Sequence, residues 1–140
     1  MNANDSHQRR VPIAVAVVER EDAFLIGLRP AGAPLAGCWE FPGGKIAADE
    51  TAADAACREC LEETGLEVRT IGEYPPAVHD YEHGGLALSF FACEPVRQRR
   101  TLPPRFRWVP RGELASYPFP PANDGLLQLL TANLPGSKDW

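Results

Sequence analysis

The chain has 140 residues, of which 44% are hydrophobic and 24% charged, which suits one folded domain and excludes a disordered chain. Its 14 basic and 19 acidic residues give a net charge of −5, which argues against an extended nucleic-acid-binding surface but not against a small basic pocket for one nucleotide. No apolar run approaches the roughly 18 residues of a membrane span, and residues 1–10 lack the apolar segment of a secretory signal. We therefore expect no membrane partner, no stable nucleic-acid partner and a cytoplasmic location.

The first part of the chain predicts a flexible arm at residues 1–10, followed by a β-hairpin. Three short apolar segments predict strands: residues 12–18, 23–28 and 39–41. A loop rich in Gly and Pro at residues 29–37 precedes the third strand, which ends at Pro42-Gly43-Gly44.

A helix over residues 52–64 is the clearest predicted element, because the segment is rich in strong helix formers. Thr51 is a favoured N-cap residue, and Gly65 stands where a glycine commonly ends a helix. Cys57 and Cys60 form a C-x-x-C spacing on its small apolar face. No second such pair exists and the histidines lack zinc-finger spacing, so we interpret both cysteines as packing residues rather than a redox or zinc site.

The second part of the chain alternates strands with loops before a closing helix. The predicted elements are strands at 66–74, 86–93 and 106–109, a loop or wide hairpin at 75–85, a helical turn at 112–117, an irregular segment at 117–123, a helix at 124–134 and a frayed tail at 135–140. Hairpins combined with two helices indicate an α/β fold, in which helices cover the faces of a mixed sheet, in a single domain spanning residues 11–134.

Three glutamates share one face of the predicted helix. Glu59, Glu62 and Glu63 are spaced i, i+3 and i+4, and their mutual repulsion costs about 0.2–0.5 kcal/mol per pair. The helix dipole also disfavours anions in the last turn. A hard divalent cation such as Mg²⁺ would reverse both penalties. The alternative is a solvated acidic face, which is common on helices.

The neighbouring residues favour the metal hypothesis. Arg58 is placed to orient one of the carboxylates by a bidentate bond. Upstream, Gly43 and Gly44 let backbone N–H groups approach an anion closely, and Lys45 adds positive charge. Metal ligands beside an anion-binding loop predict phosphate chemistry.

The segment from Gly44 to Leu66 resembles the signature of the Nudix hydrolase family, G-x₅-E-x₇-R-E-U-x-E-E-x-G-U, where U is a bulky apolar residue. Its fixed positions are occupied by Gly44, Glu50, Arg58, Glu59, Glu62, Glu63, Gly65 and Leu66. Cys60 departs mildly, because it fills an apolar position usually held by Leu, Ile or Val. The resemblance implies an α/β/α sandwich with a loop–helix–loop motif, and hydrolysis of a nucleoside diphosphate linked to another group.

The resemblance also implies roles for individual residues. It implies that Mg²⁺, or alternatively Mn²⁺, is bound by Glu59, Glu62, Glu63 and Gly43. It implies catalytic roles for Glu59, Glu62 and Arg58. Phosphate binding is implied for Arg29, Lys45 and Gly44. Glu59 is the preferred candidate for activating water, while Glu50 either reaches the metal or braces the loop. For Arg29 the alternative, given equal weight, is that it is simply a charged residue on a surface loop.

Outside this segment, W-E-F-P-G-G-K at 39–45 and Y-P-F-P-P-A-N at 117–123 resemble the MutT-type branch of the family. That likeness implies that Asn123 reads an oxidised purine and that Phe41 and Tyr81 flank the base. The alternatives are that Asn123 caps the final helix and that the two aromatic residues belong to the core.

Two departures bear on the substrate. MutT-type enzymes often carry a further glutamate where this chain has Thr101–Leu102, so the helix, Asp80 or Glu82 would have to replace it. Gly84-Gly85 also stands where bulkier residues are usual, which predicts a more open base pocket.

The sequence thus predicts a monomeric or homodimeric enzyme that converts a nucleoside triphosphate, with 8-oxo-dGTP as the leading candidate, to the monophosphate and pyrophosphate. Alternatives are a Nudix activity on CTP or dCTP, ADP-ribose or a dinucleoside polyphosphate, and a non-catalytic nucleotide-binding module. The three intact glutamates argue against the module.

Overall fold

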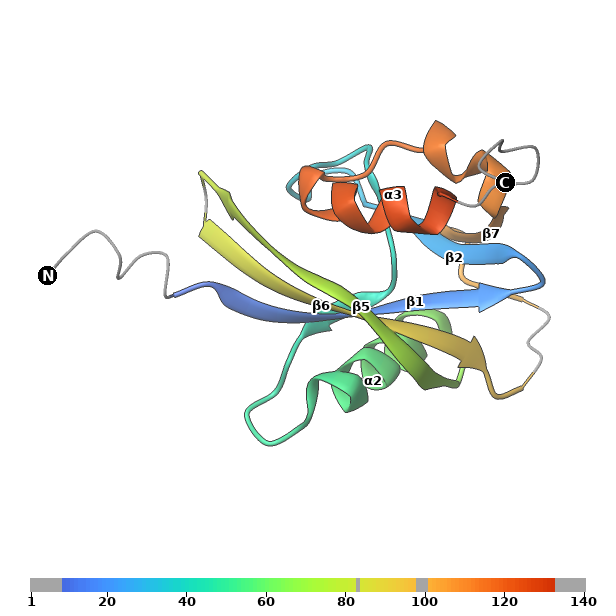
Figure 1. Cartoon of the computed structure of the whole chain (residues 1–140), viewed down its shortest axis with the longest axis horizontal. Coiled ribbons are helices and arrows are strands. Elements are labelled where there is room, and N and C mark those ends of the chain that lie inside the picture. The colour runs from blue at the N-terminus through green and yellow to red at the C-terminus, as the bar shows by residue number, and fades with distance from the viewer. Residues whose placement is uncertain (1–8, 83, 98–100, 133–140) are drawn as a thin grey trace, which may run out of the picture.

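One mixed β-sheet runs between two helices that lie on its opposite faces (Figure 1). The computed structural model describes residues 9–82, 84–97 and 101–132. Within these ranges the sheet has seven strands in the order β3-β2-β1-β6-β5, with β4 pairing with β1 and β7 pairing with β2. In chain order the elements are β1 (Val11–Arg20), β2 (Ala23–Leu28), β3 (Trp39–Glu40), β4 (Gly43–Lys45), α2 (Ala52–Thr64), β5 (Val68–Tyr81), β6 (Gly84–Pro95), β7 (Phe106–Pro110), the 3₁₀ turns η1 (Arg111–Ser116) and η2 (Pro121–Asn123), and α3 (Asp124–Thr131).

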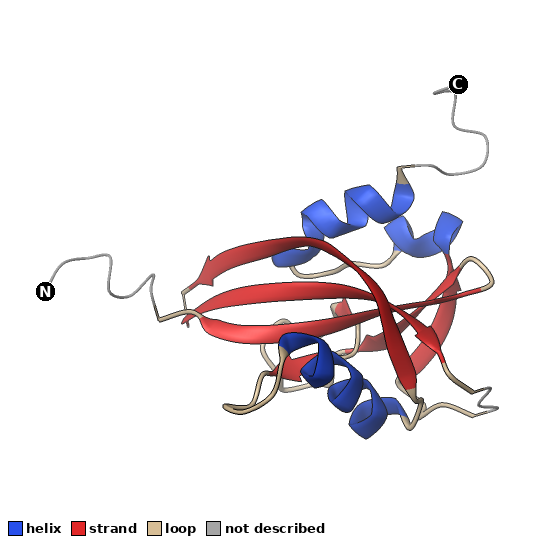
Figure 2. Ribbon diagram, turned by 60° about the horizontal axis from the view of Figure 1, so that its bottom comes forward, coloured by secondary structure: helices blue, strands red, loops and turns tan. Residues whose placement is uncertain are grey.

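Strand β1 organises the sheet because it changes partner along one edge. It runs parallel to β6 from Val11 to Val18. On its other edge, Ile13–Val15 pair with β4, whereas Glu19 and Arg20 pair with β2. The sheet therefore divides beside the middle of β1, and this division brings β4 against the face that carries α2. The expected α/β sandwich is confirmed, and Figure 2 shows its three layers from a second direction.

The two faces of β1 carry side chains of different size. Ala14, Ala16 and Val18 belong to the core cluster that includes α2, whereas Val15 and Val17 belong to the cluster that includes α3. The alternation follows from the two-residue period of a strand. Because the face toward α2 presents mainly methyl groups, the helix packs closely on the sheet.

Helix α2 has the predicted bounds, and both of its predicted caps are confirmed. The Thr51 hydroxyl accepts a hydrogen bond from the backbone N–H of Asp54 at 3.1 Å. Gly65 has the left-handed φ of 76°, and its N–H donates to the Leu61 carbonyl at 2.8 Å. The helix thus begins and ends for local reasons.

The cysteines at the interface between α2 and the sheet pack as predicted. Cys57 and Cys60 contact the same core cluster as Cys93, and the thiols are free. Burial raises the pKa of Cys60 to about 11 and that of Cys93 to about 12. These thiols are therefore protonated at neutral pH.

Of the two alternatives predicted for residues 75–85, the hairpin is confirmed and the loop is wrong. Strands β5 and β6 continue through it to a short connection after Tyr81. Pro75 and Pro76 lie where the register shifts between Tyr74 and Ala77, on the strand that ends the sheet order. Proline is tolerated at such a bulge on an edge strand, because no ladder hydrogen bond is lost.

The remaining differences concern boundaries. Strand β4 was not predicted as a separate element, and α3 ends at Thr131 rather than residue 134. The predicted helical turn at 112–117 is the 3₁₀ turn η1. The tail, residues 133–134 and the arm up to residue 8 lie outside the described residues. In the described part of the chain, none of the helices has the length and apolarity needed to cross a bilayer.

The left-handed conformation of Gly65 gives a stability prediction. Gly65→Ala should lower the free energy of unfolding by about 1 kcal/mol, because a Cβ disfavours that conformation. The matched control is Gly125→Ala in α3, where an added Cβ meets nothing within 4 Å and the helix should gain roughly 0.5 kcal/mol. Urea denaturation measures both, and equal effects would contradict the cap assignment.

Candidate active site

The segment that carries Gly43 and Gly44 lies directly against two of the helix glutamates; it forms strand β4 at the start of the connection to α2 and is called the Gly43–Gly44 loop below. The Gly43 N–H donates to Glu63 Oε1 at 3.3 Å. A Cβ on Gly44 would lie 2.7 Å from Glu59 Oε1, which is closer than real Cβ contacts allow. Residue 44 must therefore lack a side chain for the Glu59 carboxylate to reach the loop.

Arg58 ties this loop to the helix. Its Nε and Nη2 donate to the two carboxylate oxygens of Glu50 at 3.0 and 2.6 Å. Its Nη1 donates to Glu59 at 3.1 Å and to Glu62 at 3.2 Å. Nη2 also donates to the Lys45 carbonyl at 3.2 Å. One guanidinium thus orients three carboxylates and one backbone segment.

Glu50 is held by hydrogen bonds that connect the loop before α2 to the helix. Besides Arg58, the backbone N–H of Ala47 donates to it at 2.8 Å. The Arg58 hydrogen bonds, and then that of Ala47, lower the pKa of Glu50 to about 2. Of the two roles open to Glu50, this structure places it where it fixes the loop relative to α2.

Glu63 has a different environment. Burial, together with the carboxylates of Glu40 and Glu59, raises its pKa to about 7, against the opposing effects of the Gly43 N–H and of Arg105. Burial therefore disfavours the ionised form of Glu63 more than the nearby N–H and guanidinium groups compensate.

A second arginine cluster lies beside Glu63, and only one of its members was singled out from the sequence. Glu40 accepts from Arg29 Nη1 at 2.6 Å and from Arg105 Nη1 at 3.1 Å. Arg105 Nη2 lies 3.9 Å from Glu63 Oε1. Arg29 is thus placed at the carboxylate cluster rather than on a remote loop surface, whereas Lys45 is exposed.

Glu40 and Arg105 were missed because Glu40, although part of W-E-F-P-G-G-K, is not a fixed position of the Nudix signature, and Arg105 lies outside every motif. The signal that would have found them is strand register. Residues 39–40 pair with the end of β2, and Arg105 directly precedes β7, which also pairs with β2. Of the substitutes considered for the missing loop glutamate, Asp80 pairs with Arg10 at 2.8 Å and Glu82 is exposed.

The residues expected to bind the base lie toward the α3 face. Phe41 is buried and stacks on Phe119 with ring centroids 5.1 Å apart. Tyr81 contacts the same core cluster, and its ring centroid is 4.3 Å from that of His79. The aromatic residues thus contribute to the core, which was the stated alternative.

Asn123 occupies the N-cap position of α3, but its side chain makes no hydrogen bond to the start of that helix, so a capping role for its amide is wrong. Instead Nδ2 donates to the Pro120 carbonyl at 3.2 Å, and the residue is 8% exposed. Since an amide has two N–H donors, one of them remains for another partner.

The donor set at the carboxylate cluster fits a hard divalent cation. Glu59, Glu62 and Glu63 offer oxygen ligands, and Gly43 lies beside Glu63. Among the described residues no three acidic, His or Cys side chains converge on one point, and Glu59 and Glu62 are hydrogen-bonded to Arg58. A cation would neutralise the excess negative charge at Glu63.

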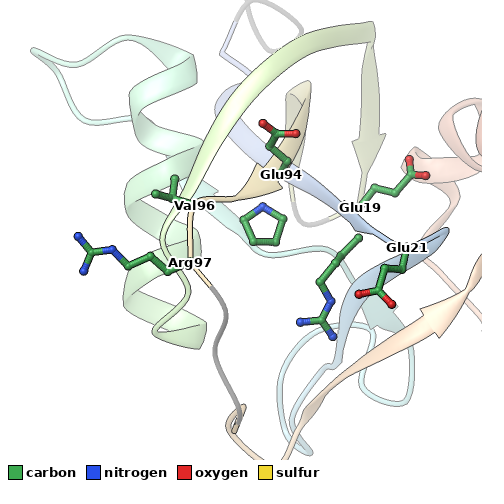
Figure 3. Close-up of a pocket in the computed structure, with 7 residues that line it drawn as sticks. Glu19, Glu21, Glu94, Val96 and Arg97 are labelled. Atoms are coloured by element: carbon green, nitrogen blue, oxygen red, sulfur yellow. The ribbon is translucent and has the colours of Figure 1, made fainter.

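An open cavity of about 350 Å³ lies elsewhere, between the C-terminal ends of β1 and β6 (Figure 3). It is lined by Glu19, Arg20, Glu21, Glu94, Pro95, Val96 and Arg97. None of these residues belongs to α2 or to the Gly43–Gly44 loop. The cavity is therefore separate from the carboxylate cluster.

Comparison with known proteins agrees with the fold and the motif. A family model described as NUDIX domain matches residues 13–129. The chain is 34% identical to a CTP pyrophosphohydrolase of Escherichia coli strain K12, over 89% of this chain and 93% of that protein. It is 35% identical to a putative 8-oxo-dGTP diphosphatase 2 of Mycobacterium tuberculosis strain H37Rv, over 91% and 92%. The solution structure of the E. coli ORF135 protein superposes with a TM-score of 0.70 and 29% identity, over 88% and 89%.

The opposite environments of Glu63 and Glu50 predict opposite pH dependence in metal-free protein. An unfolded Glu titrates near 4.5, whereas folded Glu63 titrates near 7, so its contribution to stability declines as pH rises from 4.5 to 7. Glu63→Gln should therefore become increasingly more stable than the wild type across that window in EDTA.

For Glu50 the predicted pH dependence of stability is the opposite. Its stabilising contribution is present above pH 4.5 and is lost as pH falls toward 2. Glu50→Gln should be destabilised at neutral pH, by a margin that shrinks below pH 4.5. Urea midpoints measured across pH test both variants, and parallel pH profiles would refute the assigned environments.

Proposed function

The chain belongs to the Nudix family of hydrolases, and on that premise we propose that it converts a nucleoside triphosphate to a nucleoside monophosphate and pyrophosphate with the help of a divalent cation, most suitably Mg²⁺. The observation that carries this proposal is the contact of the Gly43–Gly44 loop with Glu59 and Glu63, braced by Arg58. It combines oxygen ligands with an anion-binding loop in one place. The location proposed for this activity is the cytoplasm.

In the proposed reaction a water oxygen bonds to phosphorus as the phosphoanhydride P–O bond breaks and pyrophosphate leaves. Glu59, beside the loop, accepts the proton of the water. Glu62, Glu63 and Gly43 would hold the cation, which neutralises phosphate oxygens and lowers the pKa of the attacking water. Backbone groups at Gly44, with the side chains of Lys45 and Arg29, would bind the phosphates.

The leading substrate is 8-oxo-dGTP. The support is Asn123, whose amide is not used as a helix cap and keeps an N–H available. An amide pairs with O6 and the protonated N7 of 8-oxoguanine, whereas guanine presents a bare N7 acceptor. Phe41 and Tyr81 are packed in the core, so either residue would flank the base only through the part of its ring that remains accessible.

CTP is the second candidate. The chain matches the E. coli CTP pyrophosphohydrolase over nearly the full length of both proteins, including the segments around the base-binding candidates. A substrate panel of CTP, dCTP, dGTP, 8-oxo-dGTP and ADP-ribose separates the two candidates.

Glu59→Gln tests the proposed chemistry. We expect kcat to fall about 100-fold or more, because the amide no longer accepts the proton of water. Glu67→Gln, an exposed position just beyond α2, is the matched control and should retain activity. Steady-state release of pyrophosphate measures both variants, with circular dichroism to check folding. Full activity of Glu59→Gln would exclude this base assignment.

Asn123→Ala tests base recognition. If the wild type prefers 8-oxo-dGTP to dGTP, the variant should lose about tenfold or more of that preference, the effect of one or two base hydrogen bonds. Gln128→Ala removes an exposed amide from α3 and serves as the control. An unchanged ratio of kcat/KM values would show that Asn123 does not read the base.

A further inference from the structure

Arg105 is held firmly beside the carboxylate cluster, although it belongs to no part of the Nudix motif. Nη1 donates to the Leu28 carbonyl at 3.3 Å and to Glu40 at 3.1 Å. The guanidinium lies over the Phe106 ring, 4.2 Å from its centroid. The side chain is one-third exposed, so it faces both the protein and solvent.

The hydrogen bonds of Arg105 are directed to Glu40 rather than to Glu63. The 3.9 Å separation from Glu63 is too long for a hydrogen bond but short enough for a substantial charge interaction. Glu40 is already shared with Arg29, whose Nη1 lies 2.6 Å away. Two guanidinium groups therefore share one carboxylate, and the positive charge of Arg105 is only partly balanced by Glu40 and also acts on Glu63.

This placement creates a competition at Glu63. A divalent cation bound by that carboxylate would meet the positive charge of Arg105 a few ångströms away. Substrate phosphates would remove the conflict, because their oxygens attract both the cation and the guanidinium. The same arginine thus opposes a cation that arrives alone and favours a cation that arrives with phosphate.

We propose that Arg105 is a phosphate-binding residue that balances Glu63 in the absence of substrate and binds a phosphate oxygen of the nucleoside polyphosphate when cation and substrate are both present. The inference rests on the proposed function for the identity of the substrate, but its charge argument concerns only the cation and phosphate groups.

The test measures two affinities of the whole chain by titration calorimetry: Mn²⁺ alone, and inorganic pyrophosphate in saturating Mn²⁺. In Arg105→Gln we expect Mn²⁺ to bind about 3- to 10-fold more tightly and pyrophosphate about 10-fold more weakly, as fits the loss of one charge near each ligand. Opposite changes are the signature of the proposal, since general damage to the site would weaken both.

Two further variants separate charge from structure. Arg105→Lys keeps the charge but not the forked geometry, so Mn²⁺ affinity should stay at the wild-type value while pyrophosphate affinity falls less than in Arg105→Gln. Arg69→Gln removes the same charge from an exposed pair with Glu94 on β5 and should change neither affinity.

Unchanged or weaker Mn²⁺ binding in Arg105→Gln, unchanged pyrophosphate binding, or no pyrophosphate binding by the wild type overturns the proposal. Failure of the proposed function has another signature. If no nucleoside triphosphate is hydrolysed, the catalytic proposal is lost, whereas the two binding affinities still report on Arg105.

Discussion

The architecture of the site depends on how closely α2 approaches β1. Ala14 and Ala16 on the strand and Ala55 and Ala56 on the helix are completely buried. Small side chains at this interface bring the helix backbone near the sheet, and the carboxylates of the next turns then reach the loop formed by β4. A larger residue on either side would move the glutamates away from the glycines that they contact.

The charges of the site are arranged for a ligand rather than for stability. Four carboxylates, Glu40, Glu59, Glu62 and Glu63, are balanced by arginines on two sides. Arg58 is hydrogen-bonded to its glutamates, whereas Arg105 only approaches Glu63. The balance is therefore incomplete at Glu63, where burial disfavours the ionised form. Local destabilisation of this kind is commonly found where a protein binds a cation or substrate.

Local signals in the sequence were sufficient for α2 and its loop. The caps at Thr51 and Gly65, the alanines between them and the spacing of the glutamates act within a few residues, so the bounds of the helix and the shared face of the carboxylates could be predicted. The segment around Pro75 and Pro76 was misjudged, because a proline is acceptable or not according to which strand lies beside it, and that information is not local.

The same limit explains what was missed at the site. Glu40 and Arg105 meet only because β3 and β7 both pair with β2, and single-residue patterns do not encode that register. Asn123 was ambiguous for a related reason. Its residue type suits a helix cap, and only the folded backbone directs its amide to Pro120 instead.

The cysteine cluster between α2 and the sheet affects the resistance of the protein to oxidation. Peroxides attack the thiolate form of cysteine, and the pKa values of Cys60 and Cys93 keep that form scarce at physiological pH. Both side chains are also buried where the helix that carries the candidate metal ligands meets the sheet, Cys60 on α2 and Cys93 on β6. The sulfur atoms thus fill space next to the site without offering a nucleophile to oxidants, which suits a chain whose leading proposed substrate is itself a product of oxidative damage.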